Sequence, residues 1–248
     1  MTMTIPAHNQ VPLAPCLDRV KTVIWDLDNT LYPYTDAQIE HWHEAAVKAA
    51  QDMGVMIDAV EGMKMARQSY ETHHYSAKVF QDNYDLCTRD LHMRMTAYSQ
   101  ERILPVCGLT AEAFEKVPHL KHVILTHGHK DWADRVLRHL GLRDYFETQH
   151  ILGLEDYDFE YKDLSNRGLL MALDTVGGTA SDSVFVEDNL KNLSKGKEEG
   201  VQTAHIHHGT FCPLNDNKPS FVDHSFVKAH ELLAVLENIC SKNEFSSP

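Results

Sequence analysis

The first strongly apolar stretch of the chain, "TVIW" at residues 22–25, is followed directly by two carboxylates, Asp26 and Asp28. A short run of β-branched and aromatic residues is typical of a strand that is buried on both faces, as in a parallel sheet. Open α/β sheets bind their ligands at the carboxyl ends of such strands, so we expect both aspartates at a binding edge. The alternative is an ordinary strand that ends in a polar turn, because Asn29 and Thr30 follow as turn residues.

The pattern changes over residues 35–100, where helix-forming residues predominate and no strand pattern occurs. The segment "TDAQIEHWHEAAVKAAQDMG" begins with a threonine that can cap a helix and ends at Gly54. We expect further helices around residues 57–74, 78–87 and 88–99. A helical insertion directly after the strand that carries the aspartates would lie over them as a cap.

Strand and helix patterns alternate after residue 120, and this alternation predicts parallel strand pairing in a doubly wound sheet. The predicted strands are 122–126, 146–151, 183–188, 202–206 and an edge strand near 224–227, and the predicted helices are 130–140, 165–174, 189–199 and a last one ending near residue 240.

The fold class predicted from these patterns is α/β, with an all-helical domain inserted into a doubly wound parallel sheet. We expect a loose N-terminal leader at residues 1–20, an α/β core formed by residues 21–34 and 107–248, and a helical cap at residues 35–106.

Charge limits the range of partners. The 248 residues contain 36 Asp and Glu against 23 Lys and Arg, which gives a formal net charge of −13. Binding to nucleic-acid polymers or anionic membranes requires clustered cations, so we expect neither. No run approaches the ~18 apolar residues of a membrane span. An anionic small-molecule substrate would therefore need a local cation or a metal.

The cysteines indicate the compartment. They are five in number, scattered and without a CxxC pair, which fits reduced thiols in a cytoplasmic protein better than a disulfide framework. The N-terminal segment has neither the basic start nor the apolar core of a secretory signal.

Polar groups follow several predicted strands, at the edge where all the strands end. Two carboxylates that lie close together repel each other unless a cation lies between them. A carboxylate nucleophile, a second carboxyl group for proton transfer, a phosphate-binding hydroxyl, a lysine and a Mg²⁺ ligand are the groups that phosphoryl transfer needs. The candidates are Asp26 and Asp28, then Thr126, His127 and Gly128, then Lys162, and finally Glu187 and Asp188.

In this order, "DLDNTLY", "LTHG", a lysine and "VEDN" resemble the four motifs of the haloacid dehalogenase-like (HAD) hydrolase superfamily, over most of residues 21–206. The resemblance implies a Rossmann-like core. Within it, "WDLDNTLYP" and "VFVEDNLKNLSKGKEEGVQTAHI" look most like the pyrimidine 5′-nucleotidase branch.

The resemblance also implies roles. Asp26 matches the nucleophile that becomes an aspartyl phosphate, and Asp28 matches the general acid and base. Thr126 matches the phosphate-binding hydroxyl, beside the amides of His127 and Gly128. Lys162 matches the lysine that stabilises the charge on the nucleophile and the phosphoryl group.

The implied cofactor is Mg²⁺, held by Asp26, by the backbone carbonyl of Asp28 and by Asp188. Glu187 and Asn192 lie in or near this ligand set. The chain departs from the family pattern at His127, where relatives usually have Asn or a small residue, at Asp163, where Pro is common, and at Asn192, where many carry a second acid.

The resulting hypothesis is a Mg²⁺-dependent phosphomonoester hydrolase, acting on a pyrimidine nucleoside 5′-monophosphate. The alternatives are a phosphatase or phosphomutase for another small ester such as a sugar phosphate, or a catalytically weak binding or regulatory protein. Dehalogenation is disfavoured because it needs neither a second aspartate nor a metal. The sequence does not indicate the oligomeric state.

Two groups of histidines have more than one interpretation. "HIHHG" at residues 205–209 could be a metal tract, but histidines of a strand end and loop explain it better. Tyr70, His73, His74 and Tyr75 could contact substrate from the cap, although amphipathic helix packing explains them equally well.

Overall fold

The computed structural model describes residues 16–99, 109–209 and 218–244. Most of the predicted leader, the predicted cap–core boundary at residues 106 and 107, and most of the loop after "HIHHG" lie outside these ranges. Among the described cysteines, Cys16 and Cys87 are free thiols. No described helix is both long and apolar enough to cross a membrane.

Within the described residues, six parallel strands form one sheet in the order β3-β2-β1-β4-β5-β6, which confirms the predicted doubly wound α/β fold. The first strand lies in the middle of the sheet and is fully buried, as its apolar sequence predicts. The strands are β1 (Thr22–Trp25), β2 (Lys121–Leu125), β3 (Ile151–Leu152), β4 (Ser183–Glu187), β5 (Gln202–Ile206) and β6 (His224–Phe226).

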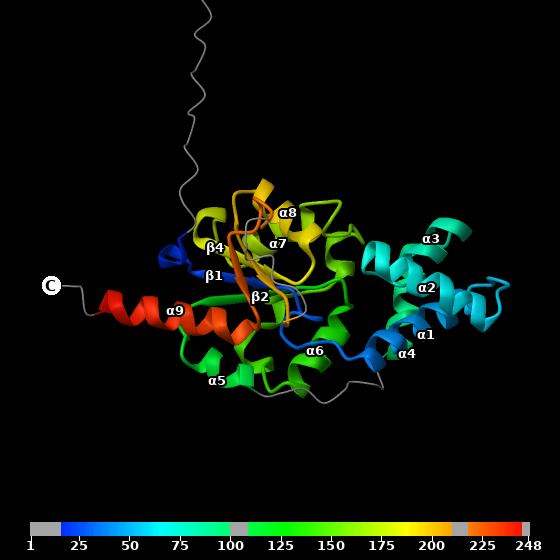
Figure 1. Ribbon diagram of the computed structural model, residues 1–248, viewed down its shortest axis with the longest axis horizontal. Helices are drawn as coiled ribbons and strands as arrows, with labels where there is room; N and C mark the ends of the chain where they lie inside the picture. Colours follow the sequence, from blue (N-terminus) through cyan, green and yellow to red (C-terminus); the bar gives the residue numbers. More distant parts are fainter. Residues whose placement is uncertain (1–15, 100–108, 210–217, 245–248) are drawn as a thin grey trace, which may run out of the picture.

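Helices cover both faces of the sheet (Figure 1). One face packs against α5 (Leu109–Glu115), α6 (Lys130–His139) and α9 (Ala229–Glu244), and the other against α7 (Arg167–Thr175) and α8 (Leu190–Glu198). Short 3-10 helices complete the core: η1 (Leu17–Arg19), η2 (Arg143–Tyr145), η3 (Thr148–His150), η4 (Leu154–Tyr157) and η5 (Ala180–Asp182).

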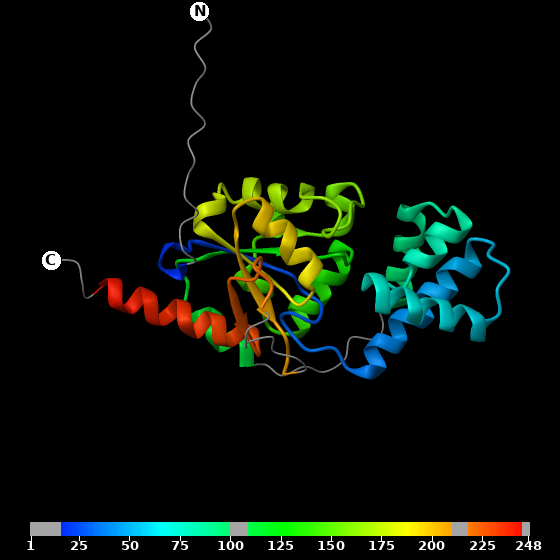
Figure 2. The same cartoon turned by 45° about the horizontal axis from the view of Figure 1, so that its top comes forward.

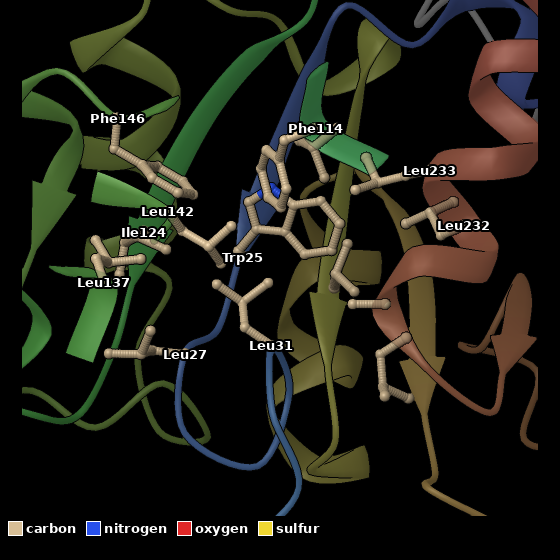
Figure 3. Packing of buried hydrophobic residues seen from close by; sticks show 14 of the residues in the cluster. Trp25, Leu27, Leu31, Phe114, Ile124, Leu137, Leu142, Phe146, Leu232 and Leu233 are labelled. Atoms are coloured by element: carbon tan, nitrogen blue, oxygen red, sulfur yellow. The ribbon is translucent and has the colours of Figure 1, made fainter. Parts of the chain in front are cut away.

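The indole ring of Trp25 lies in the larger of the two apolar layers that cover the sheet. Its centroid lies 5.6 Å from that of Phe114, which comes from α5, a helix that the sequence patterns did not predict. Figure 3 shows Phe114 on one side of this ring and Leu31 on the other. The layer therefore fixes both the end of β1 and the loop that follows it, which carries the two aspartates.

The predicted strand at residues 146–151 is wrong. The 3-10 turn η2 precedes this region and η3 lies within it, and of the predicted strand only Ile151 pairs with β2, together with Leu152 after it. The Arg143 guanidinium explains the difference, because it donates to the Phe146 carbonyl at 2.5 Å and to Thr148 Oγ1 at 2.9 Å. These bonds turn the backbone away from the sheet, although Phe146 is buried as a strand residue would be.

Between β1 and α5, the described residues form four helices: α1 (Asp36–Asp52), α2 (Ala59–His73), α3 (Lys78–Tyr84) and α4 (Thr88–Ser99). They gather at one end of the molecule, opposite α9 (Figures 1 and 2). Thr35 caps α1 as predicted, accepting a hydrogen bond from the Gln38 amide at 3.2 Å. These helices share an apolar cluster of their own. At Gly62 an added Cβ would lie 2.7 Å from Val47 Cγ1, so α1 and α2 pack closely there.

Candidate active site

The carboxyl ends of β1, β2 and β4 and the segment before α7 bring the predicted site residues to one cavity of about 760 Å³, part of it open to solvent. Each of these strands carries its motif at its carboxyl end. The parallel pairing puts all these ends at the same edge of the sheet, so the motifs meet there. The lining includes every residue predicted for catalysis, phosphate binding or metal binding: Asp26, Asp28, Thr126, His127, Gly128, Lys162 and Asp188.

Lys162 lies against Asp26. Its Nζ is 2.5 Å from Asp26 Oδ1 and 3.3 Å from Glu187 Oε1, and it also donates to the Leu125 carbonyl at 3.1 Å. Burial alone would lower the pKa of Lys162, but the charges of Asp26 and Glu187 outweigh burial and raise it. The lysine is therefore a fixed positive charge at the floor of the cavity.

The imidazole of His127 holds the backbone that carries this lysine. The Lys162 amide donates to His127 Nε2 at 2.9 Å, so this nitrogen is an acceptor and the ring is neutral. Burial and then the nearby lysine charge hold the pKa of His127 well below its usual value. His127, one of the three residues that depart from the family pattern, thus contacts the lysine segment with its side chain.

Thr126 and Gly128 form a tight turn. The Gly128 amide donates to Thr126 Oγ1 at 2.9 Å, and this hydroxyl in turn lies 3.4 Å from Asp28 Oδ2. A Cβ on Gly128 would lie 2.9 Å from Trp132 Cδ1. Only glycine therefore fits at this position without a shift of the indole.

Asp28 is held by aromatic donors. The Trp132 indole N–H donates to its two carboxylate oxygens at 2.9 and 3.2 Å, and the Tyr32 hydroxyl donates as well. Burial raises the pKa of Asp28 to about 6, against the lowering effect of these two hydrogen bonds. The sequence patterns did not single out either donor. Tyr32 lies within the "DLDNTLY" motif and could have been found, whereas Trp132 comes from a separate helix.

Asp26, Glu187 and Asp188 form an acidic cluster, with one oxygen from each lying within 4.8 Å of the others. Burial, and then the charge of Asp26, raise the pKa values of Glu187 and Asp188, the latter to about 7. Such repulsion is relieved by a cation. Glu187, rather than the side chain of Asp28, completes this cluster, and the predicted metal contact of Asp28 involves its backbone carbonyl.

Two further oxygens at this cluster fit a hard cation. Glu187 Oε2 and Asn192 Oδ1 are buried and have no hydrogen-bond partner among the described residues. Buried polar atoms are rarely left unsatisfied in folded proteins. Carboxylate and amide oxygens are the ligands that Mg²⁺ and similar cations prefer, so the donor set fits Mg²⁺.

Asn29 links the first loop to this cluster, a contact that the sequence patterns did not predict. Its side-chain amide donates to Asp188 Oδ2 at 2.6 Å, and Thr30 Oγ1 lies 3.5 Å from Asp188 Oδ1. The side chain of Asp188 is therefore oriented from the loop that also carries Asp26 and Asp28.

Aromatic side chains line the cavity on the side of α1–α4. Three of the four candidates from this region, Tyr70, His74 and Tyr75, lie on the wall, whereas His73 is not part of it. The remaining residues of this wall are Tyr34, Trp42, Ser76, His92, Met95 and Thr96.

Residues 20–200 match the model of one protein family, the haloacid dehalogenase-like hydrolases. The chain belongs to this family. The sequence resemblance at the level of the superfamily is thereby confirmed, and the protein is a hydrolase of the HAD family.

Solved structures share the fold of this hydrolase. A HAD phosphatase from Thermococcus onnurineus superposes with a TM-score of 0.59 at 20% identity, covering 88% of this chain and 98% of that one. YfnB from Bacillus subtilis, described as bound to magnesium, gives 0.58 at 16% identity and covers 88% and 99%. L-2-haloacid dehalogenase from Xanthobacter autotrophicus gives 0.55 at 15%, covering 88% and 98%. No curated protein matches the chain. At these identities the likeness shows the fold alone.

Proposed function

We propose that this hydrolase is a Mg²⁺-dependent phosphomonoesterase that forms an aspartyl phosphate on Asp26. The observation that carries the proposal is that the two aspartates have different surroundings. Asp26 contacts Lys162 within the acidic cluster, whereas Asp28 is held by Trp132 and Tyr32 outside it. Nucleophile and proton carrier need such different surroundings.

The chemistry follows from these positions. The carboxylate of Asp26 attacks phosphorus, the ester P–O bond breaks, and Asp28 gives its proton to the leaving oxygen. Asp28 then takes a proton from the water that attacks the aspartyl phosphate, which releases phosphate and restores Asp26. Lys162 keeps a positive charge beside the attacking oxygen throughout.

The cation would be held by Asp26, Asp188 and the carbonyl of Asp28, with Glu187 and Asn192 beside them. When bound, it supplies positive charge that offsets the phosphate oxygens. Loss of a halide, by contrast, needs no proton. A held proton donor at Asp28 and a cluster of three carboxylates therefore support phosphoryl transfer over dehalogenation.

For the substrate we propose a pyrimidine nucleoside 5′-monophosphate. The resemblance of "WDLDNTLYP" to the pyrimidine 5′-nucleotidase branch supports this choice. The aromatic wall formed by Trp42, Tyr70 and Tyr75 supports it as well, because a flat base can stack on such side chains.

The test is release of phosphate from p-nitrophenyl phosphate with Mg²⁺, followed by a panel of nucleotides and sugar phosphates. We expect EDTA to abolish turnover, and uridine or cytidine 5′-monophosphate to give the highest kcat/KM. Turnover that persists in EDTA would contradict the metal dependence. A panel led by a hexose or triose phosphate would overturn the substrate while leaving the phosphatase chemistry intact.

A further inference from the structure

Two histidines of "HIHHG" contact the loops that carry the site carboxylates. His205 Nε2 lies 3.0 Å from the Asp188 carbonyl, and His208 Nε2 lies 2.7 Å from the Asn29 carbonyl. A carbonyl oxygen only accepts, so Nε2 is the protonated nitrogen in both rings. Neither Nε2 is then available to bind a metal.

The sheet places His205 for this contact. In the parallel pairing of β4 with β5, His205 lies opposite Glu187, so its ring reaches the backbone of the next residue, Asp188. His205 is 6% exposed, and its Nδ1 is buried without a hydrogen-bond partner among the described residues. The bond to the Asp188 carbonyl is therefore the polar contact that the structure gives this ring.

His208 reaches further, from the end of β5 across to the loop after β1. Both partners of this bond have left-handed backbones, with φ of 49° at His208 and 60° at Asn29. Such conformations are uncommon outside glycine and are strained unless neighbouring contacts hold them. A hydrogen bond joins these two residues, so each helps to hold the other in place.

Asn29 links His208 to Asp188. Its carbonyl accepts from His208, and its side-chain amide donates to Asp188 Oδ2. Asp188 is thus held at both ends, at its carbonyl by His205 and at its carboxylate by Asn29. Four residues from three parts of the chain form one hydrogen-bonded chain around the acidic cluster.

We propose that His205 and His208 are positioning residues that hold Asp188 and Asn29 in the geometry that binds the divalent cation. This inference rests on the proposed Mg²⁺-dependent function. It assigns "HIHHG" neither to a second metal site nor to plain packing. Residues that orient metal ligands typically change metal affinity or activity 10- to 100-fold when replaced.

The experiment compares two substitutions at each position. Gln retains an N–H donor near the place of Nε2, whereas Met has a similar length and no donor, and both are unbranched. Mg²⁺ and Mn²⁺ affinities of the full chain are measured by titration calorimetry, together with p-nitrophenyl phosphate hydrolysis as a function of Mg²⁺ concentration. His224→Met is the matched control, since His224 contacts Gln202 Oε1 at 3.4 Å, away from the site loops.

We expect His208→Met and His205→Met to weaken cation binding roughly 10- to 100-fold, and the Gln variants to keep most of it. His224→Met should bind as the wild type does. The inference is overturned if the Met variants bind the cation like the wild type, or if Gln and Met lose affinity equally at both positions. Failure of the proposed function looks different, because the wild type itself would then neither bind the cation nor hydrolyse phosphate esters.

Discussion

At the scale of single residues, Leu27 separates the two aspartates and anchors them. Its side chain is fully buried in the core, so Asp26 and Asp28 on either side of it both face the cavity. Their partners differ, with a lysine for Asp26 and an indole and a phenol for Asp28. The division of roles between them can therefore be tested by replacing each in turn.

Asp26→Asn should abolish turnover with every ester and form no phosphoenzyme, because an amide does not attack phosphorus usefully. Asp28→Asn should block the first step for a ribose 5′-hydroxyl, which leaves only when protonated. With p-nitrophenyl phosphate the first step should partly survive, since p-nitrophenolate leaves readily, while water attack stays slow.

Rapid mixing of Asp28→Asn with p-nitrophenyl phosphate should then give a burst of up to one equivalent of p-nitrophenol, followed by a slow phase. The wild type should show the burst weakly or not at all. A burst from Asp26→Asn, or equal losses on both substrates for Asp28→Asn, would contradict the assignment.

Replacing Trp132 tests the proposed role of Asp28 as the proton carrier. The hydrogen bond from its indole stabilises the ionised form of Asp28 and so lowers a pKa that burial raises to about 6. Trp132→Phe removes this donor and should raise the pKa further. Asp28 must be protonated to act as an acid, so kcat/KM for a nucleotide falls as pH rises through this pKa. In Trp132→Phe, the falling limb of the pH profile of kcat/KM should therefore move to higher pH.

At pH values below this fall in kcat/KM, the activity of Trp132→Phe should drop by much less than the ~10²-fold or more expected for losing the acid itself. Trp42→Phe is the matched control. Its indole packs on Trp132 with ring centroids 4.9 Å apart, but its N–H has no hydrogen-bond partner among the described residues. A limb that stays in place in Trp132→Phe, or moves equally in both variants, would show that Trp132 does not set this pKa.

At the scale of secondary structure, α1–α4 close the cavity from the side opposite the strands. Lys191 at the start of α8 donates to the Thr72 carbonyl at 2.9 Å, near the C-terminal end of α2, where helix carbonyls favour a positive charge. Tyr161 donates to Gln81 Oε1 of α3 at 3.0 Å. We propose that these helices form a cap that opens and closes over the aspartates and sets substrate choice.

Tyr70 on α2 tests the cap. Tyr70→Ala should lower kcat/KM for cytidine 5′-monophosphate about 5-fold or more, because a stacked base contributes roughly 1–3 kcal/mol. Glycerol phosphate has no ring to stack and should be hydrolysed nearly as well as by the wild type. Tyr70→Phe keeps the ring and is the control. Equal losses on both substrates in Tyr70→Ala would place specificity in the core instead.

Much of this architecture could be predicted because three of the four motifs stand at the carboxyl end of an apolar strand. The apolar runs in the sequence located β1 and β4 directly, and the carboxylates stand at the ends of these strands. The region around Phe146 could not be predicted, because Arg143 turns its backbone through contacts that do not appear as a pattern. The donors to Asp28 and the bonds of "HIHHG" likewise depend on elements that meet only after folding.

At the scale of the whole molecule, the proposed substrate is an anionic ester, whereas the protein has a formal net charge of −13. Salt screens the long-range repulsion more than it screens short contacts with a buried lysine or a bound cation. Raising KCl from about 20 to 200 mM at fixed Mg²⁺ should therefore increase kcat/KM for a nucleotide by a few-fold. Sucrose at matched osmolality serves as the control. A decrease with salt would mean that local attraction dominates the encounter.

The place of β1 in the sheet has a consequence for how the chain folds. Thr22 of this strand pairs with Lys121 on one side and with Ser183 on the other, so its neighbours are synthesised long after it. The helices α1–α4 can form from contacts close in sequence, whereas closing such long loops costs entropy before any pairing is gained. This buried, largely apolar strand thus leaves the ribosome with both edges unpaired, a state prone to aggregation. Asp26, the proposed nucleophile, is translated early, but its loop can take its final shape only after the strands that flank β1 have been synthesised.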